Sequence, residues 1–328
     1  MRQILILLFF SGSLACAPFQ PIHDPFEDQG RSEETAEPGA RPLRIDVLDV
    51  DQGDATLIIG PGGKTMLIDA GRAGEGLVTV LPFLEAAGVD RLDWIVATHY
   101  DADHIGGITE VLRGADQEVG TEDDFFPAEA LIDRGGKTDK ATDAYEGYAA
   151  LAAPYRREAE PGMVFPLGDG AEAEVVVVNG RFEDGRQIPL EPDEENEACI
   201  GLLITYGSFR YFTAGDLTGG GAPGGYVTKD LETIAGEIVG DVDILHASHH
   251  GSESSSNRVF LEETHPEVVV ISVGAENDYG HPAATALTRI EDTGATIYRT
   301  DRDGAIEIAS DGQGYKIFAA TASVSEFP

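Results

Sequence analysis

The sequence predicts an α/β protein in which two mixed β-sheets pack face to face, with helices on the outside. Two successive halves of the chain each show short strand-like runs alternating with helical patterns, and no linker-like segment separates them. Hydrophobic residues make up 42% of the 328 residues, which is enough for a substantial core. We therefore expect one large domain over residues 43–328.

The first half contains apolar runs bounded by turn residues such as "DQGD" and "PGGK". The expected strands are 43–50, 55–60, 64–71 and 93–98. Helical periodicity, with apolar residues recurring at three and four, predicts helices over 76–89 and 104–114. Residues 114–162 are polar, acidic and weakly periodic, so we expect loops or an insertion there.

The second half repeats this pattern. The expected strands are 173–180, 200–207, 210–216, 242–252, 267–274, 296–300 and 305–310, and the expected helices are 227–238 and 283–294. The strand that begins at residue 242 runs into a histidine-rich loop. The segment "TDRDG" superficially resembles a calcium loop but lacks the later acidic ligand, so a hairpin turn between the last two strands is expected.

The N-terminal residues have the pattern of an export signal. Arg2 precedes the apolar run "ILILLFF" and the small residues "SGSLACA", and this run is too short to span a bilayer. We expect a signal peptide over 1–16, with Cys16 as the lipidated residue of a bacterial lipoprotein. Ordinary cleavage after Ala15 or Ala17 is the alternative. Residues 17–42, rich in Pro, Glu and Gly, predict a flexible linker between the cell envelope and the domain.

Acidic residues dominate the charge. The 59 Asp and Glu against 22 Lys and Arg give a formal charge of −37, which disfavours a broad surface for binding polyanions. The basic residues near the motifs described below are Arg72, Arg134, Lys137 and Arg258. So few cations suit one or two phosphates, or a short single strand of nucleic acid, better than a long duplex.

The stretch "THYDADHIGG", residues 98–107, places two histidines and two aspartates within six positions at the end of a predicted strand. Imidazoles and carboxylates at a rigid strand-to-helix junction suit Zn²⁺, Mn²⁺ or Fe²⁺. Gly106 and Gly107 would let the backbone approach closely. The alternative is a capped helix start with Asp103 as the N-cap, which explains one aspartate but not the paired histidines.

These residues resemble the signature of the metallo-β-lactamase superfamily, His-x-His-x-Asp-His, with Asp101 in place of the second histidine. That departure resembles the branch that contains the soluble hydrolase domain of ComEC competence proteins. Further similar stretches are "VDQGDATLI", "LIDAG", "FTAGD", "LHASHHGS" and "NDYGHP". The resemblance implies a four-layer αββα sandwich with one or two divalent ions, Zn²⁺ or Mn²⁺, at one edge between the sheets.

The resemblance also implies roles for individual residues. The residues expected to bind metal are His99, Asp101, Asp103, His104, Asp216, His249 and His281. We favour His250 as a catalytic residue facing the substrate, with Asp103 as the residue that holds or accepts a proton. Which of the later histidines reach metal is left open.

Other polar residues in the motifs are candidates for orienting the ligands. Asp54 and Asp69 could accept hydrogen bonds from metal-bound histidines, although turn capping and a solvated strand end are the respective alternatives. The usual third-motif histidine is not visible before Asp216, and Asn196 could fill its space. His246 and His265 are expected to be bystanders.

Together these observations predict an exported metal-dependent hydrolase of the cell envelope. Phosphodiester cleavage by metal-hydroxide attack is the leading hypothesis. The alternatives are hydrolysis of a carbonyl substrate, such as a lactam, lactone or thioester, and a metal-binding envelope protein without turnover. Contact with the membrane is expected only through the N-terminal lipid.

The lipoprotein hypothesis predicts that labelled palmitate enters the wild-type protein in its native host but not a Cys16→Ser variant, because the thiol is the acylation site. Equal labelling of both proteins would contradict it. Export without any label would favour ordinary cleavage.

Overall fold

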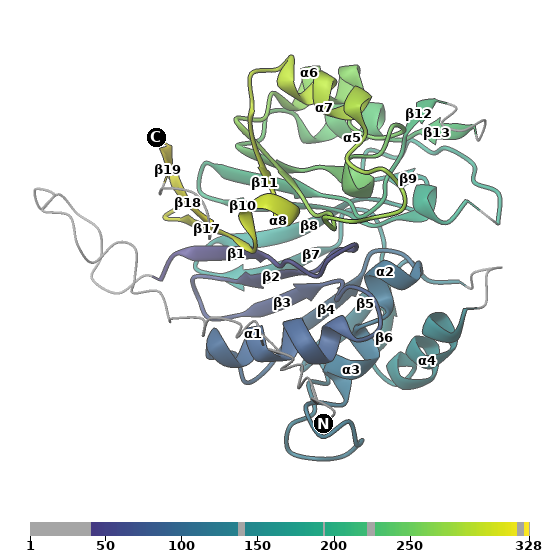
Figure 1. Cartoon of the computed structure of the whole chain (residues 1–328), viewed down its shortest axis with the longest axis vertical. Helices are drawn as coiled ribbons and strands as arrows, with labels where there is room; N and C mark the ends of the chain where they lie inside the picture. The colour runs from purple at the N-terminus through teal and green to yellow at the C-terminus, as the bar shows by residue number, and fades with distance from the viewer. Residues whose placement is uncertain (1–40, 137–141, 193, 222–226, 320–324, 328) are drawn as a thin grey trace, which may run out of the picture. The chain divides into compact units, whose positions relative to one another are not determined.

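The computed structural model describes residues 41–136, 142–192, 194–221, 227–319 and 325–327. Two large sheets lie face to face, and helices cover the outer face of each, which gives four layers (Figure 1). The predicted α/β class and four-layer sandwich are therefore confirmed. The predicted signal peptide, Cys16, Lys137 and nearly all of the predicted linker lie outside the described residues.

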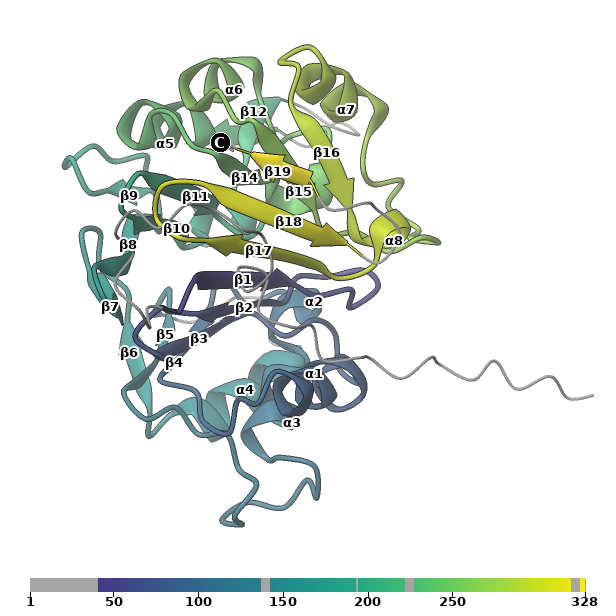
Figure 2. The same ribbon diagram turned by 90° about the vertical axis from the view of Figure 1, so that its left-hand side faces the viewer.

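The first sheet has nine strands in the order β19-β18-β17-β1-β2-β3-β4-β5-β6. In chain order they are β1 (Leu43–Val47), β2 (Thr56–Ile59), β3 (Thr65–Ile68), β4 (Trp94–Ala97), β5 (Ala130–Asp133), β6 (Arg156–Glu158), β17 (Ile306–Ser310), β18 (Tyr315–Ala319) and β19 (Ser325–Phe327). The closing strand β17 returns beside β1, as Figure 2 shows. Strands β3 to β6 run parallel, so their carboxyl ends meet at one edge.

The second sheet has the order β16-β15-β14-β11-β10-β8-β7, and β9 pairs with β8. Its strands are β7 (Val164–Gly168), β8 (Ala171–Val178), β9 (Arg181–Phe182), β10 (Gly201–Tyr206), β11 (Phe209–Thr213), β14 (Ile244–His246), β15 (Val268–Ile271) and β16 (Thr296–Arg299). Strands β11, β14, β15 and β16 run parallel. A separate small sheet pairs β12 (Gly219–Gly221) with β13 (Thr228–Asp230).

Helices flank both sheets. The π-helix η1 (Gly76–Val80) with α1 (Leu81–Ala86), α2 (Ala102–Ile105), α3 (Ile108–Leu112) and α4 (Asp143–Ala152) accompany the first sheet, and α5 (Glu232–Val239), α6 (Arg258–Thr264) and α7 (Ala284–Glu291) the second. The short helices η2 (Asn196–Ala198), η4 (Ser248–Gly251) and α8 (Thr300–Asp303) lie in loops. Within the described ranges, no helix has the length and apolar character needed to cross a bilayer.

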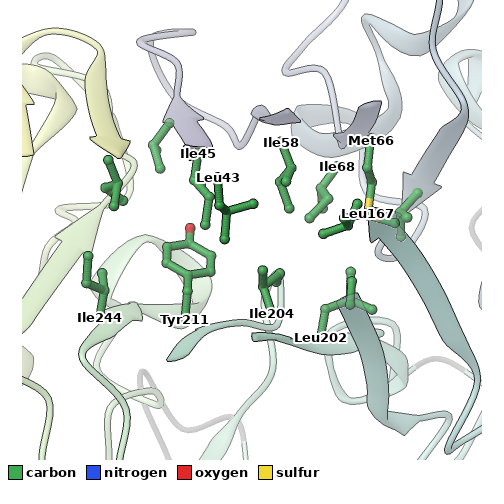
Figure 3. Close-up of a cluster of buried hydrophobic side chains, with 14 of the residues drawn as sticks. Leu43, Ile45, Ile58, Met66, Ile68, Leu167, Leu202, Ile204, Tyr211 and Ile244 are labelled. Carbon is green, nitrogen blue, oxygen red and sulfur yellow. The ribbon is translucent and has the colours of Figure 1, made fainter. Parts of the chain in front are cut away.

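The core follows from the alternation of side chains along the strands. In β3, Met66 and Ile68 face the second sheet, whereas Leu67 faces the helices. Figure 3 shows Ile68 and its neighbours opposite Leu202 and Ile204 of β10 in the layer between the sheets. Each sheet thus has two buried faces, which explains why its central strands are apolar almost throughout.

Several expected elements differ from those observed. Residues 114–162, expected as loops or an insertion, contribute β5, α4 and β6 and so extend the first sheet. Residues 227–238, expected to form one helix, contain strand β13, and helix α5 begins only after it. The hairpin expected around "TDRDG" is wrong, because β16 and β17 belong to different sheets and the helix α8 connects them.

The helix expected over 104–114 is divided into α2 and α3 at Gly106 and Gly107, where the backbone lies against the end of β3. A Cβ atom on Gly107 would fall 2.1 Å from the carbonyl oxygen of Ala70. The amide of Gly107 also donates to the carbonyl oxygen of Gly71 at 3.0 Å. The expectation that these glycines permit close approach is confirmed.

The Gly107→Ala substitution should lower the free energy of unfolding by about 1–3 kcal/mol, because the added methyl group must displace backbone. The matched control is Gly147→Ala inside α4, where the nearest contact of a new Cβ is Thr109 Cγ2 at 3.7 Å. That variant should gain up to about 1 kcal/mol from helix propensity. Urea denaturation measures both changes, and equal effects of the two substitutions would contradict the close-approach argument.

Candidate metal centre

The candidate site lies where the carboxyl ends of strands from both sheets meet. The first sheet contributes Asp69 after β3 and the loop of His99 to His104 after β4. The second contributes Asp216 after β11 and the loop of His249 and His250 after β14. Parallel strands direct these loops to one edge, and the packing of the sheets brings the two sets together.

The loop that follows β4 does not use its aspartates for capping. The N-cap of α2 is Asp101 rather than Asp103, and its side chain accepts no capping hydrogen bond. The side chains of Asp101 and Asp103 are 34% and 20% exposed, so both are accessible from solvent. The capping explanation for Asp103 is therefore wrong, and both carboxylates are free to bind a cation.

Asp216 lies at the centre of the site, with its two carboxylate oxygens facing different imidazoles. Oδ2 lies 3.8 Å from Nε2 of His99 and 3.5 Å from Nε2 of His249. Oδ1 lies 3.1 Å from Nε2 of His104 and 3.6 Å from Nε2 of His250. The side chain of Asp216 is only 5% exposed, so water cannot separate these groups freely.

Asp69 orients the two imidazoles that come from the β4 loop. Its Oδ2 accepts from Nδ1 of His104 at 2.8 Å and from Oγ1 of Thr98 at 2.6 Å. Because Thr98 donates its only hydroxyl proton to Asp69, the contact of 3.1 Å to Nδ1 of His99 requires the imidazole to donate. Both imidazoles therefore carry a proton on Nδ1 and direct Nε2 towards Asp216, where a metal ion would take the place of a proton.

His250 is oriented by a different partner. Its Nδ1 donates to the carbonyl oxygen of Ser272 at 3.0 Å, which leaves Nε2 facing Asp103 Oδ2 at 3.5 Å. His249 and His250 both have left-handed backbone dihedrals, with φ of 52° and 53°. Such strain is held in place by surrounding structure and is concentrated at functional sites.

The donor set fits a divalent cation. The buried atoms that find no hydrogen-bond partner among the described residues include Nε2 of His99, His104 and His250 and Oδ1 of Asp54 and Asp216. An unpartnered buried polar atom is costly, so five such atoms close together imply a bound ligand, and nitrogen and carboxylate oxygen donors suit a divalent cation. The donor atoms form four overlapping triads: His104 with His99 and Asp216, His104 with Asp103 and His250, His104 with Asp54 and Asp69, and Asp54 with Asp216 and His250.

The pKa shifts of the site residues also favour the binding of a cation. Burial alone would lower the pKa of His104, but the carboxylates of Asp216 and Asp69 raise it well above its usual value. Burial also opposes protonation of His250, yet Asp216 and neighbouring carboxylates raise its pKa to about 9. Conversely, the imidazoles hold the pKa of Asp216 well below its usual range although burial opposes ionisation. The carboxylates thus make the electrostatic potential at the site negative, which attracts cations. A bound metal ion would displace the imidazole protons.

Asp54 belongs to two of these triads, whereas His281 and Asn196 belong to none. The ring centroid of His281 lies 5.4 Å from that of His249 and 6.3 Å from that of His250. Asn196 places its Nδ2 at 3.4 Å from both ring nitrogens of His249. Asp54 lies 3.6 Å from Nδ1 of His250 and 3.9 Å from Nδ1 of His104, both longer than a hydrogen bond.

Of the two histidines expected to be bystanders, His265 is exposed and pairs with Asp241. His246 is buried beside the centre, where its Nε2 lies 2.9 Å from Oγ of Ser272 and 3.7 Å from Asp54. Cys199 is fully buried, and its Sγ accepts from the amide of Asp216 at 3.3 Å. Burial raises the pKa of this thiol well above its usual value.

Sequence reasoning missed the buried ion pair behind His99. Arg134 donates from Nε and Nη2 to the two oxygens of Glu195, each at 2.7 Å, and Glu195 also accepts from the amide of Tyr100. No local signal joins Arg134 to a residue 61 positions away. Because this guanidinium is paired and buried, it is not available to bind a substrate phosphate.

Comparison with known proteins agrees with this fold. Residues 48–274 match the Metallo-beta-lactamase superfamily, and the chain belongs to that family. It is 29% identical over 274 residues to Competence protein ComA of Neisseria gonorrhoeae and 26% identical over 281 residues to ComE operon protein 3 of Bacillus subtilis (strain 168). These alignments cover 83% and 80% of this chain but 33% and 32% of those proteins, so it spans about a third of their length.

Solved structures align more loosely. The CmlA beta-hydroxylase E377D mutant aligns with a TM-score of 0.47 at 14% identity, over 84% of this chain and 55% of that one. Zn²⁺-bound PqqB from Methylobacterium extorquens aligns with a TM-score of 0.45 at 14% identity, over 78% and 97% of the two chains. The predicted resemblance to the superfamily and to competence proteins is confirmed by the family match and the curated relatives. The role of each individual ligand stays a prediction.

The Asp69→Asn substitution should weaken metal binding about 10- to 100-fold, because one carboxylate orients both His99 and His104. The matched control is Asp93→Asn at the other end of β4, where the carboxylate accepts from the amide of Thr65 at 3.0 Å. That variant should lose stability but keep its metal affinity. Isothermal titration with Zn²⁺ distinguishes them, and equal affinity of the Asp69 variant and wild type would contradict the orienting role.

Proposed function

We propose that this member of the superfamily is an exported hydrolase that uses divalent metal to cleave phosphodiester bonds. The observation that carries the proposal is the position of Asp216, whose two oxygens face two separate sets of donors. A carboxylate shared in this way suits a centre of two ions. Two-ion centres are well suited to phosphoryl transfer, because they stabilise both the attacking and the leaving oxygen.

The geometry supports an assignment of ligands to each ion. The set on the Oδ2 side of Asp216 is His99, Asp101 and His249, and the set on the Oδ1 side is Asp103, His104 and His250. In this proposal His249 takes the place of the missing third-motif histidine. His250 becomes a ligand and His281 faces the substrate, which reverses the roles favoured from the sequence, because Nε2 of His250 is buried among carboxylates and His281 is more exposed.

When bound, the ions supply a water-derived nucleophile at neutral pH and positive charge that stabilises the group under attack. The chain's own residues hold this arrangement in place. Asp103 is accessible and placed to accept the proton of the attacking water. His281, on the wall of the adjoining cleft, is positioned to contact the phosphoryl group.

Substituting Asp103→Ala or His104→Ala should each reduce turnover by at least about 10³-fold while the protein stays folded, because each removes a donor from the centre. The substrates are bis(4-nitrophenyl) phosphate, a short single-stranded oligonucleotide and a β-lactam, tested after metal loading. His265→Ala, which alters an exposed loop histidine far from the centre, is the control and should retain wild-type rates. Circular dichroism checks the fold of each variant.

The outcomes separate the alternative functions. Normal activity of either alanine variant would exclude this site. Turnover of the lactam without turnover of a phosphodiester would replace the proposal with a carbonyl hydrolase. Metal retention without turnover of any of these substrates would favour a binding protein.

Asp101 provides a test of metal preference. A carboxylate where the superfamily usually has an imidazole makes the site harder, so activity after chelation and refilling should be higher with Mn²⁺ than with Zn²⁺. Asp101→His should narrow or reverse this preference. Higher activity of the wild type with Zn²⁺ would contradict the argument from ligand hardness.

A further inference from the structure

A cleft of about 800 Å³ opens beside the metal centre, and His249 and His281 form part of its wall. Its other walls come from the segment around η2, the serine loop after η4 and the start of α7. This volume lies in the range of small-molecule sites. A phosphodiester held at the centre would place its non-reacting arm in this cleft.

The lining of the cleft is acidic. Five glutamates contribute to it, and the described residues that form the wall include neither lysine nor arginine. Two of the five are neutralised from outside the cleft: Glu195 pairs with Arg134, and Glu194 pairs with Lys229. Burial raises the pKa of a third, Glu197.

The last two glutamates, Glu191 and Glu253, remain exposed and form no ion pair with any residue the structure describes. The nearby guanidinium of Arg289 donates instead to the backbone oxygens of Glu253 and Ser255. Both residues line the cleft without an ion pair among the described residues, although the guanidinium of Arg289 lies close enough to interact with the charge of Glu253. A polynucleotide would have to place its flanking phosphates against them.

An aromatic ring lines the same cleft. Tyr279 is 65% exposed, and its ring stacks on His281 with centroids 5.8 Å apart and an interplanar angle of 7°. Its position next to His281 fixes it at the mouth of the metal centre, with one face open. Carboxylates together with an open aromatic face are the chemistry that recognises an ammonium group.

We propose that this cleft selects phosphodiesters whose non-reacting arm carries an ammonium group. The proposal rests on the phosphodiesterase function proposed above and names its substrate class. The phosphate monoanion is held at the metal centre, while Glu191, Glu253 and Tyr279 hold the cationic arm. These three are specificity-determining residues and take no part in the bond-breaking step.

The test uses the full metal-loaded chain and two substrates with the same 4-nitrophenyl leaving group. One carries a 2-(trimethylammonio)ethyl arm, and the other its neutral isostere, the 3,3-dimethylbutyl arm. We expect kcat/KM to be about tenfold higher for the cationic arm at low salt, mostly through KM, and the difference to shrink as ionic strength rises. A short single-stranded oligonucleotide is assayed in parallel.

Two double variants separate local from global charge effects. Glu191→Gln with Glu253→Gln should bring the ratio of kcat/KM for the two arms towards one. Glu85→Gln with Glu262→Gln removes the same charge from exposed helix surfaces elsewhere and should leave the ratio as in the wild type. Tyr279→Leu should lower the ratio, because it keeps an apolar group but removes the aromatic face.

Equal rates on the two arms, with both hydrolysed, would overturn the cleft proposal and leave the phosphodiesterase function standing. Preference for the oligonucleotide over both arms would do the same. Equal loss of the ratio in both double variants would also overturn it, because the effect would then come from net charge. No turnover of any phosphodiester would overturn the proposed function and the substrate class together.

Discussion

The central constraint in this structure is a buried carboxylate, Asp216, on which imidazole nitrogens from both sheets converge. His99 and His104 direct Nδ1 towards Thr98 and Asp69, and His250 directs Nδ1 towards the carbonyl oxygen of Ser272, so three Nε2 atoms lie 3.1 to 3.8 Å from Asp216. A divalent cation bound there would replace the protons that the carboxylates attract, and because the donors come from both sheets, it would also link the two halves of the sandwich.

The backbone around the centre is organised to hold this arrangement before any ion enters. The amide of Asp54 donates to the carbonyl oxygen of Asp103, and a Cβ on Gly53 would lie 2.3 Å from that oxygen. On the opposite side, the left-handed conformations of His249 and His250 aim two successive imidazoles into the site. Strain of this kind persists only where neighbouring structure fixes it, and the parallel strands on both sides supply that support.

The sequence predicts the fold class and the local ligand loop, because both depend on short-range patterns. The alternation of Met66, Leu67 and Ile68 and the spacing from His99 to His104 are visible without any tertiary information. Residues 114–162 were missed because α4 buries only one face, with Tyr145 and Tyr148 inward, within an acidic sequence. The hairpin before β17 was wrongly predicted because turn residues mark a change of direction but not the sheet to which the next strand belongs. The orientation of His250 depends on Ser272, and the pairing of Arg134 on Glu195, and neither contact has a local signature.

The net negative charge of the chain and the carboxylates of the metal centre have the same effect: both attract cations and repel anions. A net charge of −37 raises the local concentration of divalent cations around the molecule and opposes the approach of polyanions. The carboxylates that raise the pKa values of His104 and His250 favour a metal ion for the same reason that they favour a proton. An anionic group would therefore bind only beside the metal ions, because their positive charge makes the local electrostatic potential positive. The cleft at Glu191 and Glu253 is acidic again, so a phosphodiester bound as proposed would present one phosphate to the centre and no further negative charge to the cleft.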